Sequence, residues 1–379
     1  MRDEITKAKK IIFKFGTNIL RNDDGEISLS RIYSFIEEIS KLHKSGKEII
    51  IVTSGAVGLG AKKLGIDISD SIQLKQACAA VGQSQLMSIY EDGFDKYGIK
   101  VAQILLTEDD FSQRARYLSL RNTLNQLLEL DVVPIINQND TVSTYGLEYY
   151  KDMVEVCFAD NDKLSALLAS EMRADLLVIL SDINGLYTQN PKEFSDAEFI
   201  PVVEKVTDEI QKLGKDASLG GRGGMKTKLE AAKVVTTAGG CLLIANGKES
   251  NIISKIFTQD NVGTIFLPSE TLSGKKHWIA YATNVMGTLV VNDGAKNALI
   301  EKCSSLLAIG LIEVKYNFKK GDIVSIVDAN GQEFARGMVN YDFDECEKLI
   351  GAYSDEFIEK IGYKTYDEII GRDNIVITL

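Results

Sequence analysis

The sequence predicts an α/β protein in which helices sandwich a mostly parallel sheet, followed by a small β-rich domain. Over roughly the first 265 residues, short runs of Val, Ile and Leu alternate with longer amphipathic segments. Near-continuous apolar runs are typical of strands buried on both faces, and their alternation with helices indicates a parallel sheet. Near residue 280 the pattern changes to closely spaced short strands, one helix and turn signals such as "DANGQ".

The individual elements follow from these patterns. Apolar, β-branched runs predict strands at residues 10–16, 47–55, 100–107, 132–137, 174–182 and 241–247. The segments between them predict helices at residues 28–45, 71–97, 112–130, 161–173, 225–238 and 249–258. Pro, Ser and Gly in "LPSETLSGKKHW" indicate a linker, so we expect domains at residues 1–266 and 280–379 and a linker at residues 267–279.

Composition and charge favour a protein that acts on a small molecule. The net charge of −11 disfavours general nucleic-acid binding, because phosphate contacts need clustered Lys and Arg. The five cysteines form no CxxC pair, and the two histidines lie in no catalytic or metal-binding motif. Since no apolar stretch approaches the roughly 20 residues of a membrane span and the N-terminus lacks signal-peptide features, we expect a cytoplasmic location and no membrane partner.

Polar residues follow four of the predicted strands, at the edge where parallel sheets bind ligands. They are Gly16, Thr17 and Asn18; Thr53, Ser54 and Gly55; Asn137 to Asp140; and Ser181 and Asp182. Turn formation explains each group singly, whereas together they favour a binding site. Lys14 lies within the apolar run "IIFKFG", so it is either an exposed edge-strand lysine or meets an anion such as phosphate near the backbone N–H groups of Gly16 and Thr17.

Two glycine-rich turns precede helices, where free N–H groups favour anions. "VTSGAVGLGAKKLG" (52–65) lacks the GxGxxG spacing of a dinucleotide fold and better fits a small anion or carboxylate. "GGRGGMKTKLEAAK" (220–233) lacks the ending of a P-loop, but it adds Lys226 and Lys228 to a helix N-terminus. The alternative for this second stretch is a flexible surface loop with solvated lysines.

Asp160, Asn161 and Asp162 precede or begin another predicted helix, and three such residues exceed what an N-cap requires. An acidic side chain there could orient two phosphate-binding lysines or help to hold a metal. Phosphoryl transfer depends on positioning and charge neutralisation more than on a histidine base, so these residues favour that chemistry.

The chain resembles the glutamate 5-kinase family, whose members have an amino-acid-kinase domain followed by a PUA domain. The resemblance rests on these motifs in order: "KFGTN", "IVTSGAVGLG", "AAVGQSQLM", "QILLT", "VVPIINQNDTV", "DNDKLSALLA", "LSDINGLYT" and "GRGGMKTKLEAA". It implies transfer of the ATP γ-phosphoryl group to the side-chain carboxylate of L-glutamate, which starts proline biosynthesis. It also implies Mg²⁺ as cofactor, a homo-oligomer and feedback inhibition by proline.

The resemblance also assigns residues. It implies catalytic roles for Lys14, Asp162 and Lys228, with the aspartate aligning both lysines. It implies glutamate binding by Ser54, Gly55, Asp140 and Asn161, with Asp140 facing the α-ammonium group. It implies ATP contacts from Lys14, Gly16, Ser181, Asp182, Arg222, Gly223, Gly224, Met225, Lys226, Thr227 and Lys228.

Three positions depart from the family pattern. Ala159 stands where glycine is usual, Arg222 replaces a small Thr, and Asn18 replaces Ser. If position 159 needs a positive φ, its methyl group adds a strain of about 1 kcal/mol or more. None of the three removes a proposed catalytic group, so nucleotide affinity is the property we expect them to change.

Other functions stay open at this point. A sister kinase could phosphorylate N-acetylglutamate, aspartate, carbamate or a nucleoside monophosphate, although Asp140 argues for a free α-amino group. A regulatory amino-acid sensor or an RNA-binding protein is the alternative from another class. Residues 280–379 contain 10 Lys and Arg against 16 Asp and Glu, a net charge of −6. Because this surface should repel a phosphate backbone, we expect no appreciable RNA binding.

Overall fold

The chain forms two compact units, which a computed structural model describes over residues 3–22, 27–67, 71–107, 109–112, 114–142, 161–191, 193–214, 224–258, 262–269, 274–281 and 285–378. The first unit extends to Thr271 and the second runs from Leu272 to Leu379. The predicted domain limits themselves stay a prediction. Helix α11 (Gly274–Tyr281) occupies the second half of the predicted linker and packs on strands of the second unit.

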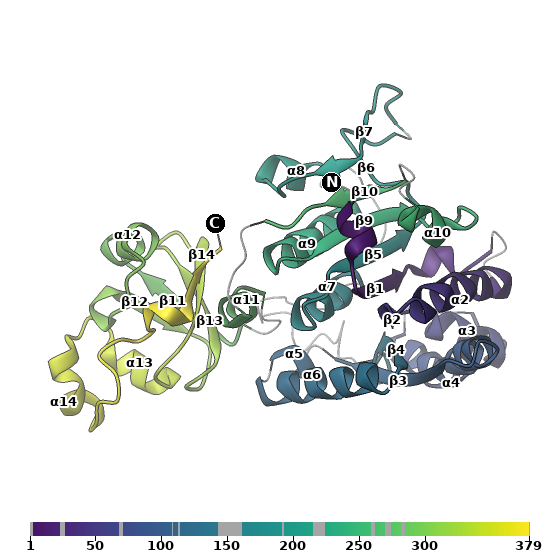
Figure 1. Ribbon diagram of the computed structural model, residues 1–379. Coiled ribbons are helices and arrows are strands. Elements are labelled where there is room, and N and C mark those ends of the chain that lie inside the picture. The colour runs from purple at the N-terminus through teal and green to yellow at the C-terminus, as the bar shows by residue number, and fades with distance from the viewer. Residues whose placement is uncertain are drawn as a thin grey trace. The chain divides into compact units, whose positions relative to one another are not determined.

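An eight-stranded sheet forms the centre of the first unit, which confirms the predicted α/β sandwich (Figure 1). In spatial order its strands are β3 (Lys100–Leu106), β4 (Val132–Gln138), β2 (Glu48–Val52), β1 (Lys10–Phe15), β5 (Leu176–Ser181), β9 (Cys241–Asn246), β10 (Thr264–Phe266) and β8 (Val202–Val203). The first six strands are mutually parallel, and β10 is antiparallel to β9. Strands β6 (Leu186–Tyr187) and β7 (Phe199–Ile200) form a separate pair.

Helices cover both faces of this sheet (Figure 1). One face carries α1 (Asp3–Lys7), α2 (Leu29–Lys44), α4 (Ile72–Asp95) and α10 (Ile252–Phe257). The other carries α6 (Arg114–Glu129), α7 (Asn161–Glu171) and α9 (Met225–Thr237). The remaining helices are η1 (Thr17–Ile19), α3 (Ala56–Leu64), α5 (Asp109–Ser112) and α8 (Asp208–Lys212). No helix in the described ranges combines the length and apolar character that crossing a membrane requires.

The second unit is the small β-rich domain that the sequence predicts. Its sheet has the order β12 (Leu311–Lys315), β11 (Gly287–Val291), β13 (Ile323–Val327), β14 (Glu333–Met338) and β15 (Ile375–Ile377). Its helices are α11, α12 (Asp293–Lys302), η3 (Ala308–Gly310), α13 (Phe343–Leu349), η4 (Ser354–Glu356), α14 (Phe357–Ile361) and η5 (Arg372–Asn374). The turn predicted at "DANGQ" joins β13 to β14, where Asp328 accepts hydrogen bonds from the N–H groups of Asn330 and Gln332.

Glycines let α3 lie directly against α4 and so fix the helix that follows strand β2. A Cβ atom on Gly60 would overlap the carbonyl oxygen of Cys78, and one on Gly82 would overlap that of Ala56. Both obstacles are backbone atoms, which cannot rotate away as a side chain can. The two helices must therefore separate if either glycine acquires a side chain.

We expect Gly60→Ala to lower the free energy of unfolding by roughly 1–3 kcal/mol, because the methyl group forces α3 away from α4. Urea unfolding followed by circular dichroism measures this loss. Lys63→Ala is the matched control, since Lys63 is exposed on the same helix and such changes stay within about 0.5 kcal/mol. Equal stability of both variants would contradict the close packing of α3 on α4.

Candidate active site

Lys14 lies in the middle of the sheet, not at its edge. Its strand β1 pairs with β2 on one side and β5 on the other, with Lys14 opposite Val52 and Ile179. The side chain is only 3% exposed. The edge-strand alternative is therefore wrong, and a buried ammonium group at this position needs an anionic partner.

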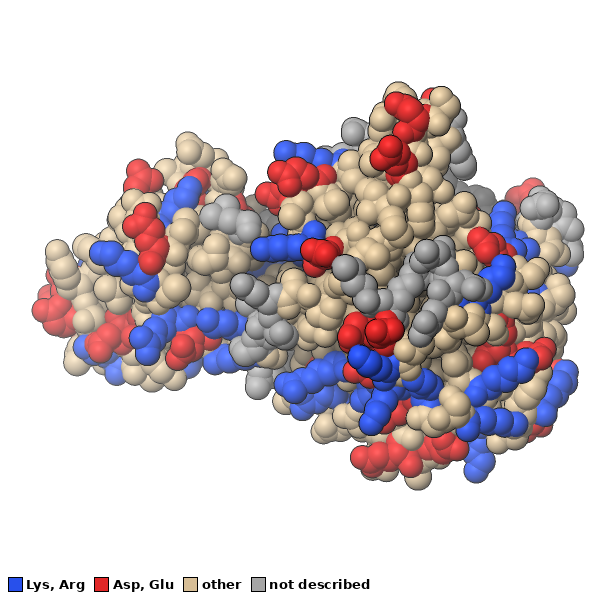
Figure 2. Space-filling model, turned by 45° about the horizontal axis from the view of Figure 1, so that its top comes forward, with Lys and Arg blue, Asp and Glu red and all other residues tan. Residues whose placement is uncertain are grey.

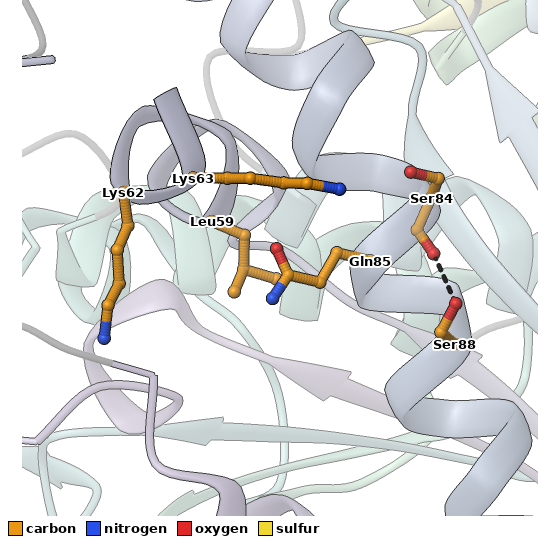
Figure 3. A pocket seen from close by; sticks show the side chains of 6 residues that line it. All are labelled: Leu59, Lys62, Lys63, Ser84, Gln85 and Ser88. Atoms are coloured by element: carbon orange, nitrogen blue, oxygen red, sulfur yellow. Dashed lines mark hydrogen bonds between the residues drawn. The ribbon is translucent and has the colours of Figure 1, made fainter. Parts of the chain in front are cut away.

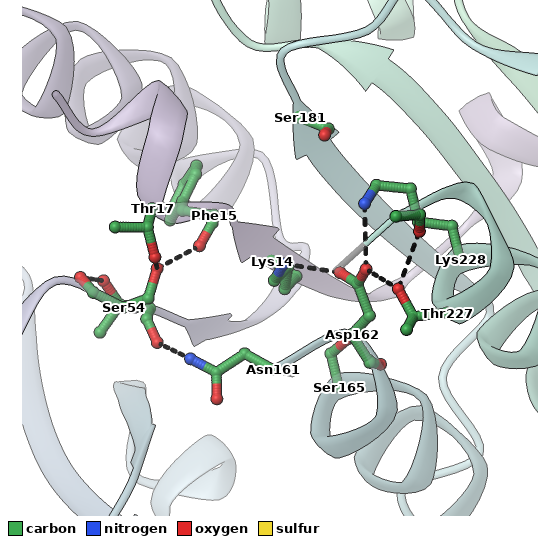
Figure 4. A network of polar contacts seen from close by, with 12 residues as sticks. Lys14, Phe15, Thr17, Ser54, Asn161, Asp162, Ser165, Ser181, Thr227 and Lys228 are labelled. Atoms are coloured by element: carbon green, nitrogen blue, oxygen red, sulfur yellow. Dashed lines mark hydrogen bonds and ion pairs between the residues drawn. The ribbon is translucent and has the colours of Figure 1, made fainter. Parts of the chain in front are cut away.

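That partner is Asp162, which joins two lysines from distant parts of the chain. Asp162 lies in the first turn of helix α7, and its carboxylate is fully buried. One of its oxygens, Oδ1, lies 2.6 Å from Lys14 Nζ, and Oδ2 lies 3.1 Å from Lys228 Nζ. Thr227 Oγ1 lies within 3.1 Å of the same Oδ2 (Figure 4). The structure thus brings together the three residues predicted as catalytic, which we name the Lys14–Asp162–Lys228 cluster.

The three side chains of the cluster sum to a net positive charge. Burial alone raises the pKa of Asp162, but the ammonium groups of Lys14 and Lys228 outweigh it and hold that pKa well below its usual range. The carboxylate is therefore ionised at neutral pH, and two cations against one anion leave a charge of +1. Because Lys228 is also only 4% exposed, this charge is poorly screened and attracts an anion.

The N-terminus of α9 adds to this attraction. Gly224 is its N-cap residue and provides no side-chain cap, and the first turn contains no acidic residue. The backbone N–H groups of that turn and the helix dipole favour a negatively charged ligand. Arg222 and Gly223, which the resemblance assigns to ATP, lie outside the described residues, as do Ala159 and Asp160.

A pocket of about 430 Å³ opens beside the cluster. Lys228, Gly224 and Met225 line it on the side of α9, while Ser181 and Asp182 line it at the end of strand β5. These residues include five of those that the resemblance assigns to ATP. Residues that were not predicted also line it, among them Asn184, Tyr187, Leu213 and Asn246.

Lys226 differs from its neighbour Lys228. Its side chain is exposed, and its ammonium group lies 3.9 Å from Glu230 on the next turn of α9. It does not line the pocket, so the structure does not bring this predicted ATP contact to the site. The solvated-lysine alternative holds for Lys226 and is wrong for Lys228.

Asp182 keeps its charge at the pocket wall. It accepts hydrogen bonds from Asn18 Nδ2 at 3.2 Å and from Ser181 Oγ at 3.3 Å. Burial raises the pKa of Asp182, but the hydrogen bonds it accepts and the charge of Lys228 lower it overall. Asn18, one of the departures from the family pattern, thus has a defined partner.

Gly16 does not offer its N–H group to a ligand, contrary to the prediction. That group donates a hydrogen bond to the carbonyl oxygen of Leu180, because β1 and β5 remain paired at this point. The missing side chain also matters, since a Cβ on Gly16 would lie 3.3 Å from the carbonyl oxygen of Leu180 and 3.9 Å from Lys14 Nζ. A side chain at position 16 would therefore occupy space beside the Lys14 ammonium group.

Three of the four predicted glutamate-binding residues lie just beyond the ends of β2 and β4. Ser54 Oγ donates to the carbonyl oxygen of Phe15 at 2.9 Å and accepts from Thr17 Oγ1 at 3.2 Å. Gly55 adopts a left-handed conformation, with φ of 104°, and begins α3. Asp140 lies just beyond β4, in a described segment that ends at residue 142.

Asn161 connects this region to the cluster. Its Nδ2 donates to the carbonyl oxygen of Thr53 at 2.7 Å and reaches Asn137 Oδ1 at 3.3 Å. The side chain is 8% exposed, and its Oδ1 has no hydrogen-bond partner among the described residues (Figure 4). A buried carbonyl oxygen without a donor indicates a place for a ligand N–H or O–H group.

Sequence reasoning missed several residues around the site. Gln83, whose Oε1 accepts a hydrogen bond from Asn137 Nδ2 at 2.9 Å, lies on α4 within the motif "AAVGQSQLM", to which no role was assigned. Asn246, whose Nδ2 donates to Asn184 Oδ1 at 2.8 Å, ends strand β9. The rule that identified the other strand ends applies to Asn246 as well and would have found it.

Comparison with known proteins agrees with this geometry. Residues 9–246 match the model of the amino acid kinase family, and residues 287–361 match that of the PUA domain. A carbamate kinase from Giardia lamblia bound to AMP-PNP superposes with a TM-score of 0.51 at 16% identity, covering 70% of this chain and all of that one, which shows the same fold. Fold and site together define an amino acid kinase.

Relatives of similar sequence show which family of amino acid kinases the chain belongs to. The chain is 42% identical over 371 residues to a glutamate 5-kinase from Caldanaerobacter subterraneus subsp. tengcongensis, covering 97% of both chains. It is 43% identical over 376 residues to a glutamate 5-kinase from Geobacter sulfurreducens, covering 98% of both. The chain belongs to the glutamate 5-kinase family.

Proposed function

We propose that the chain transfers the γ-phosphoryl group of ATP to the side-chain carboxylate of L-glutamate and that the Lys14–Asp162–Lys228 cluster performs the transfer. The activity is that of a glutamate 5-kinase, the first step of proline biosynthesis, as in the family to which the chain belongs. The roles of individual residues are part of the proposal. The observation that carries them is the buried net positive charge beside a pocket.

The charge of the cluster meets the main obstacle of the reaction. A carboxylate must approach a phosphate, so two anions come together. An oxygen of the glutamate side chain forms a bond to the γ-phosphorus, the bond from that phosphorus to the bridging oxygen breaks, and ADP leaves. Fixed positive charges aimed at these oxygens stabilise the transition state, and Asp162 keeps both ammonium groups in place without neutralising them fully.

No general base is needed for this step. A glutamate side chain has a pKa of about 4.3 and is already ionised at neutral pH. Neither of the two histidines in the sequence belongs to the site, since His43 lies on α2 and His277 on α11. The site therefore supplies charge and position, and it moves no proton.

The pocket beside the cluster fits the nucleotide. The phosphates would lie at the N-terminus of α9 beside Lys228, where N–H groups and Gly224 face them. Leu213 and Met225 give the pocket apolar surface for a flat base, and the amide groups of Asn184 and Asn246 can form hydrogen bonds with it.

Mg²⁺ is the cofactor that the proposal includes. In the described ranges, no three His, Cys, Asp or Glu side chains gather into a ligand set. Both oxygens of Asp162 face lysines, and Asp182 is the carboxylate that lines the pocket. Mg²⁺ typically binds through one or two carboxylates and the substrate phosphates, so the site fits an ion held mainly by ATP with Asp182 nearby. Bound there, the ion would neutralise phosphate charge.

Glutamate would bind between the ends of β2 and β4. Its α-ammonium group can donate to the buried Oδ1 of Asn161 and pair with Asp140. Ser54 and Gly55 lie at the start of α3. Ser54 lies on the same side of Asp162 as Lys14 (Figure 4). This arrangement requires a free amino group, which favours glutamate over N-acetylglutamate.

A hydroxamate assay tests the function. The protein is incubated with ATP, Mg²⁺ and hydroxylamine, which traps an acyl phosphate as a hydroxamate. We expect product from L-glutamate and much less from N-acetylglutamate or aspartate. Absence of product from L-glutamate would contradict the proposed function.

We expect Asp140→Ala to raise the glutamate KM by about tenfold or more with a smaller effect on kcat, because it removes the anion that pairs with the α-ammonium group. Steady-state kinetics with glutamate and with glutarate, which lacks the amino group, measure this effect. The KM of glutarate should stay the same. An unchanged glutamate KM would refute the role of Asp140.

Regulation, assembly and location also belong to the proposal. The family resemblance supports feedback inhibition by proline, a homo-oligomer and a cytoplasmic location. On the second unit, acidic and basic side chains are interspersed over the visible face (Figure 2). With a net charge of −6 over residues 280–379, this surface supports a role in assembly or regulation more than RNA binding.

A further inference from the structure

We infer that Arg21 binds the α-carboxylate of the acceptor amino acid and thereby selects substrates that carry this group. The inference rests on the proposed function and names a residue that neither the strand-end pattern nor the family motifs identify. It starts from the position of the guanidinium group. Arg21 follows η1, and a Cβ atom on Gly58 would overlap its Nη2 and lie 3.3 Å from its Cζ.

This contact places the guanidinium group on the first turn of α3. Gly58 is the third residue of that helix, and the helix begins directly after Ser54 and Gly55, the predicted glutamate contacts. Because position 58 has no side chain, the guanidinium group lies against the helix backbone. Arg21 is thus a cation beside the same helix terminus that the substrate approaches.

The backbone around Arg21 is held firmly enough to position its side chain. Arg31 Nη1 donates to the carbonyl oxygens of Ile19 at 2.7 Å and of Arg21 at 2.9 Å. Arg21 also forms an antiparallel bridge with Ile27, and Ile27 Cδ1 lies 3.5 Å from a Cβ built on Gly55. Both residues of this bridge therefore lie beside the start of α3.

Among the described residues, no acidic side chain balances the charge of Arg21. A cation beside a helix N-terminus opposes the helix dipole, and the first turn of α3 contains no acidic residue. No carboxylate of the described residues lies within 4 Å of the guanidinium group. Arginine typically binds a carboxylate through two parallel hydrogen bonds, so a ligand carboxylate is the partner that this geometry fits.

The charges of the substrate also point to the guanidinium group of Arg21. Glutamate brings a side-chain carboxylate to the cluster and an ammonium group to Asp140 and Asn161. Its α-carboxylate then needs a cation, but Lys14 and Lys228 already face Asp162 and the phosphates. The buried Oδ1 of Asn161, which lacks a partner among the described residues, independently marks a ligand at the end of β2. Arg21 provides the missing positive charge there.

Three compounds distinguish binding of the α-carboxylate by Arg21 from other roles of this residue. L-Glutamate has all three groups, glutarate lacks the amino group, and 4-aminobutyrate lacks the α-carboxylate. Affinities come from the glutamate KM and from inhibition constants of both analogues, so an analogue that reacts slowly is still informative. We expect Arg21→Gln to weaken the binding of glutamate and of glutarate by the same factor of about 10 to 100. The affinity for 4-aminobutyrate should stay unchanged.

Lys63→Gln is the matched control. It removes one positive charge at the opposite end of α3, where Lys63 lines a separate surface pocket with Leu59 and Ser84 (Figure 3). All three affinities should stay the same in this variant. Thermal unfolding of Arg21→Gln checks that the fold is retained, and Arg21→Lys should recover part of the lost affinity.

The outcomes are distinct. If Arg21→Gln weakens the binding of all three compounds equally, Arg21 supports the shape of the site in general and the inference is wrong. If it changes none, the inference is also wrong. Failure of the wild-type protein to phosphorylate glutamate would instead refute the proposed function. That failure is visible before any variant is compared.

Discussion

Lys228→Met is expected to lower kcat by about 10²- to 10³-fold while the glutamate KM changes little. The ammonium group lies beside the pocket and faces the transferring phosphoryl group in the proposed geometry, so its charge acts mainly in the transition state. Methionine keeps the length of the buried stem and removes only the charge. Lys14 still pairs with Asp162 at 2.6 Å in this variant, so the fold should persist. Steady-state kinetics with saturating ATP and Mg²⁺ measure kcat.

Lys233→Met is the control for this variant. It makes the same chemical change on the same helix, α9, but away from the pocket. Its kcat should remain within about twofold of the wild-type value. A drop of less than tenfold in Lys228→Met would show that Lys228 serves the fold or ground-state binding and would reject its catalytic role.

The central strands of the fold were predictable because their apolar runs are nearly continuous. All six predicted strands form, and five of the six expected helices match closely, since buried parallel strands need Val, Ile and Leu on both faces. The antiparallel strand β10 and the two-residue strands β6, β7 and β8 were not predicted. Elements this short carry no periodic pattern, and only their pairing partners stabilise them.

The site was predictable where a charged residue lies within an apolar segment of the sequence. A lysine in an apolar strand and an aspartate beginning a buried helix both signal a polar partner, and Lys14 and Asp162 indeed pair. Which lysine of α9 faces inward was not predictable, because Lys226 and Lys228 differ only in helical phase. Arg21 was not predictable for another reason: its contact with Gly58 joins two positions far apart in the sequence, and no local pattern indicates it.

Asp162→Asn is expected to lower the free energy of unfolding at pH 7 by about 3–5 kcal/mol, because it leaves two buried ammonium groups without their shared counter-charge. Lys14 and Lys228 are only 3% and 4% exposed, so water cannot replace the carboxylate. Urea unfolding measures the loss. Activity should fall by orders of magnitude as well, since both lysines lose the group that orients them.

The pH dependence identifies the cause. The pKa of Asp162 lies well below its usual range in the folded protein, so its stabilising contribution is complete above about pH 4 and is lost as pH falls through the lowered value. The stability difference between wild type and Asp162→Asn should therefore be constant near neutral pH and shrink in acid. A difference that stays constant down to pH 2 would contradict the ion-pair explanation.

A triple variant separates stability from function. Replacing the whole cluster by apolar side chains, as Lys14→Met, Asp162→Leu and Lys228→Met, removes every buried charge at once. Such replacements are commonly neutral or stabilising, because no ion remains to be taken out of water. We expect the free energy of unfolding of this variant to be at least as high as that of the wild type, and we expect no detectable kinase activity. The ion pairs of the cluster then give the fold no stability that apolar packing could not also give. The charge of the cluster therefore serves phosphoryl transfer, which requires it.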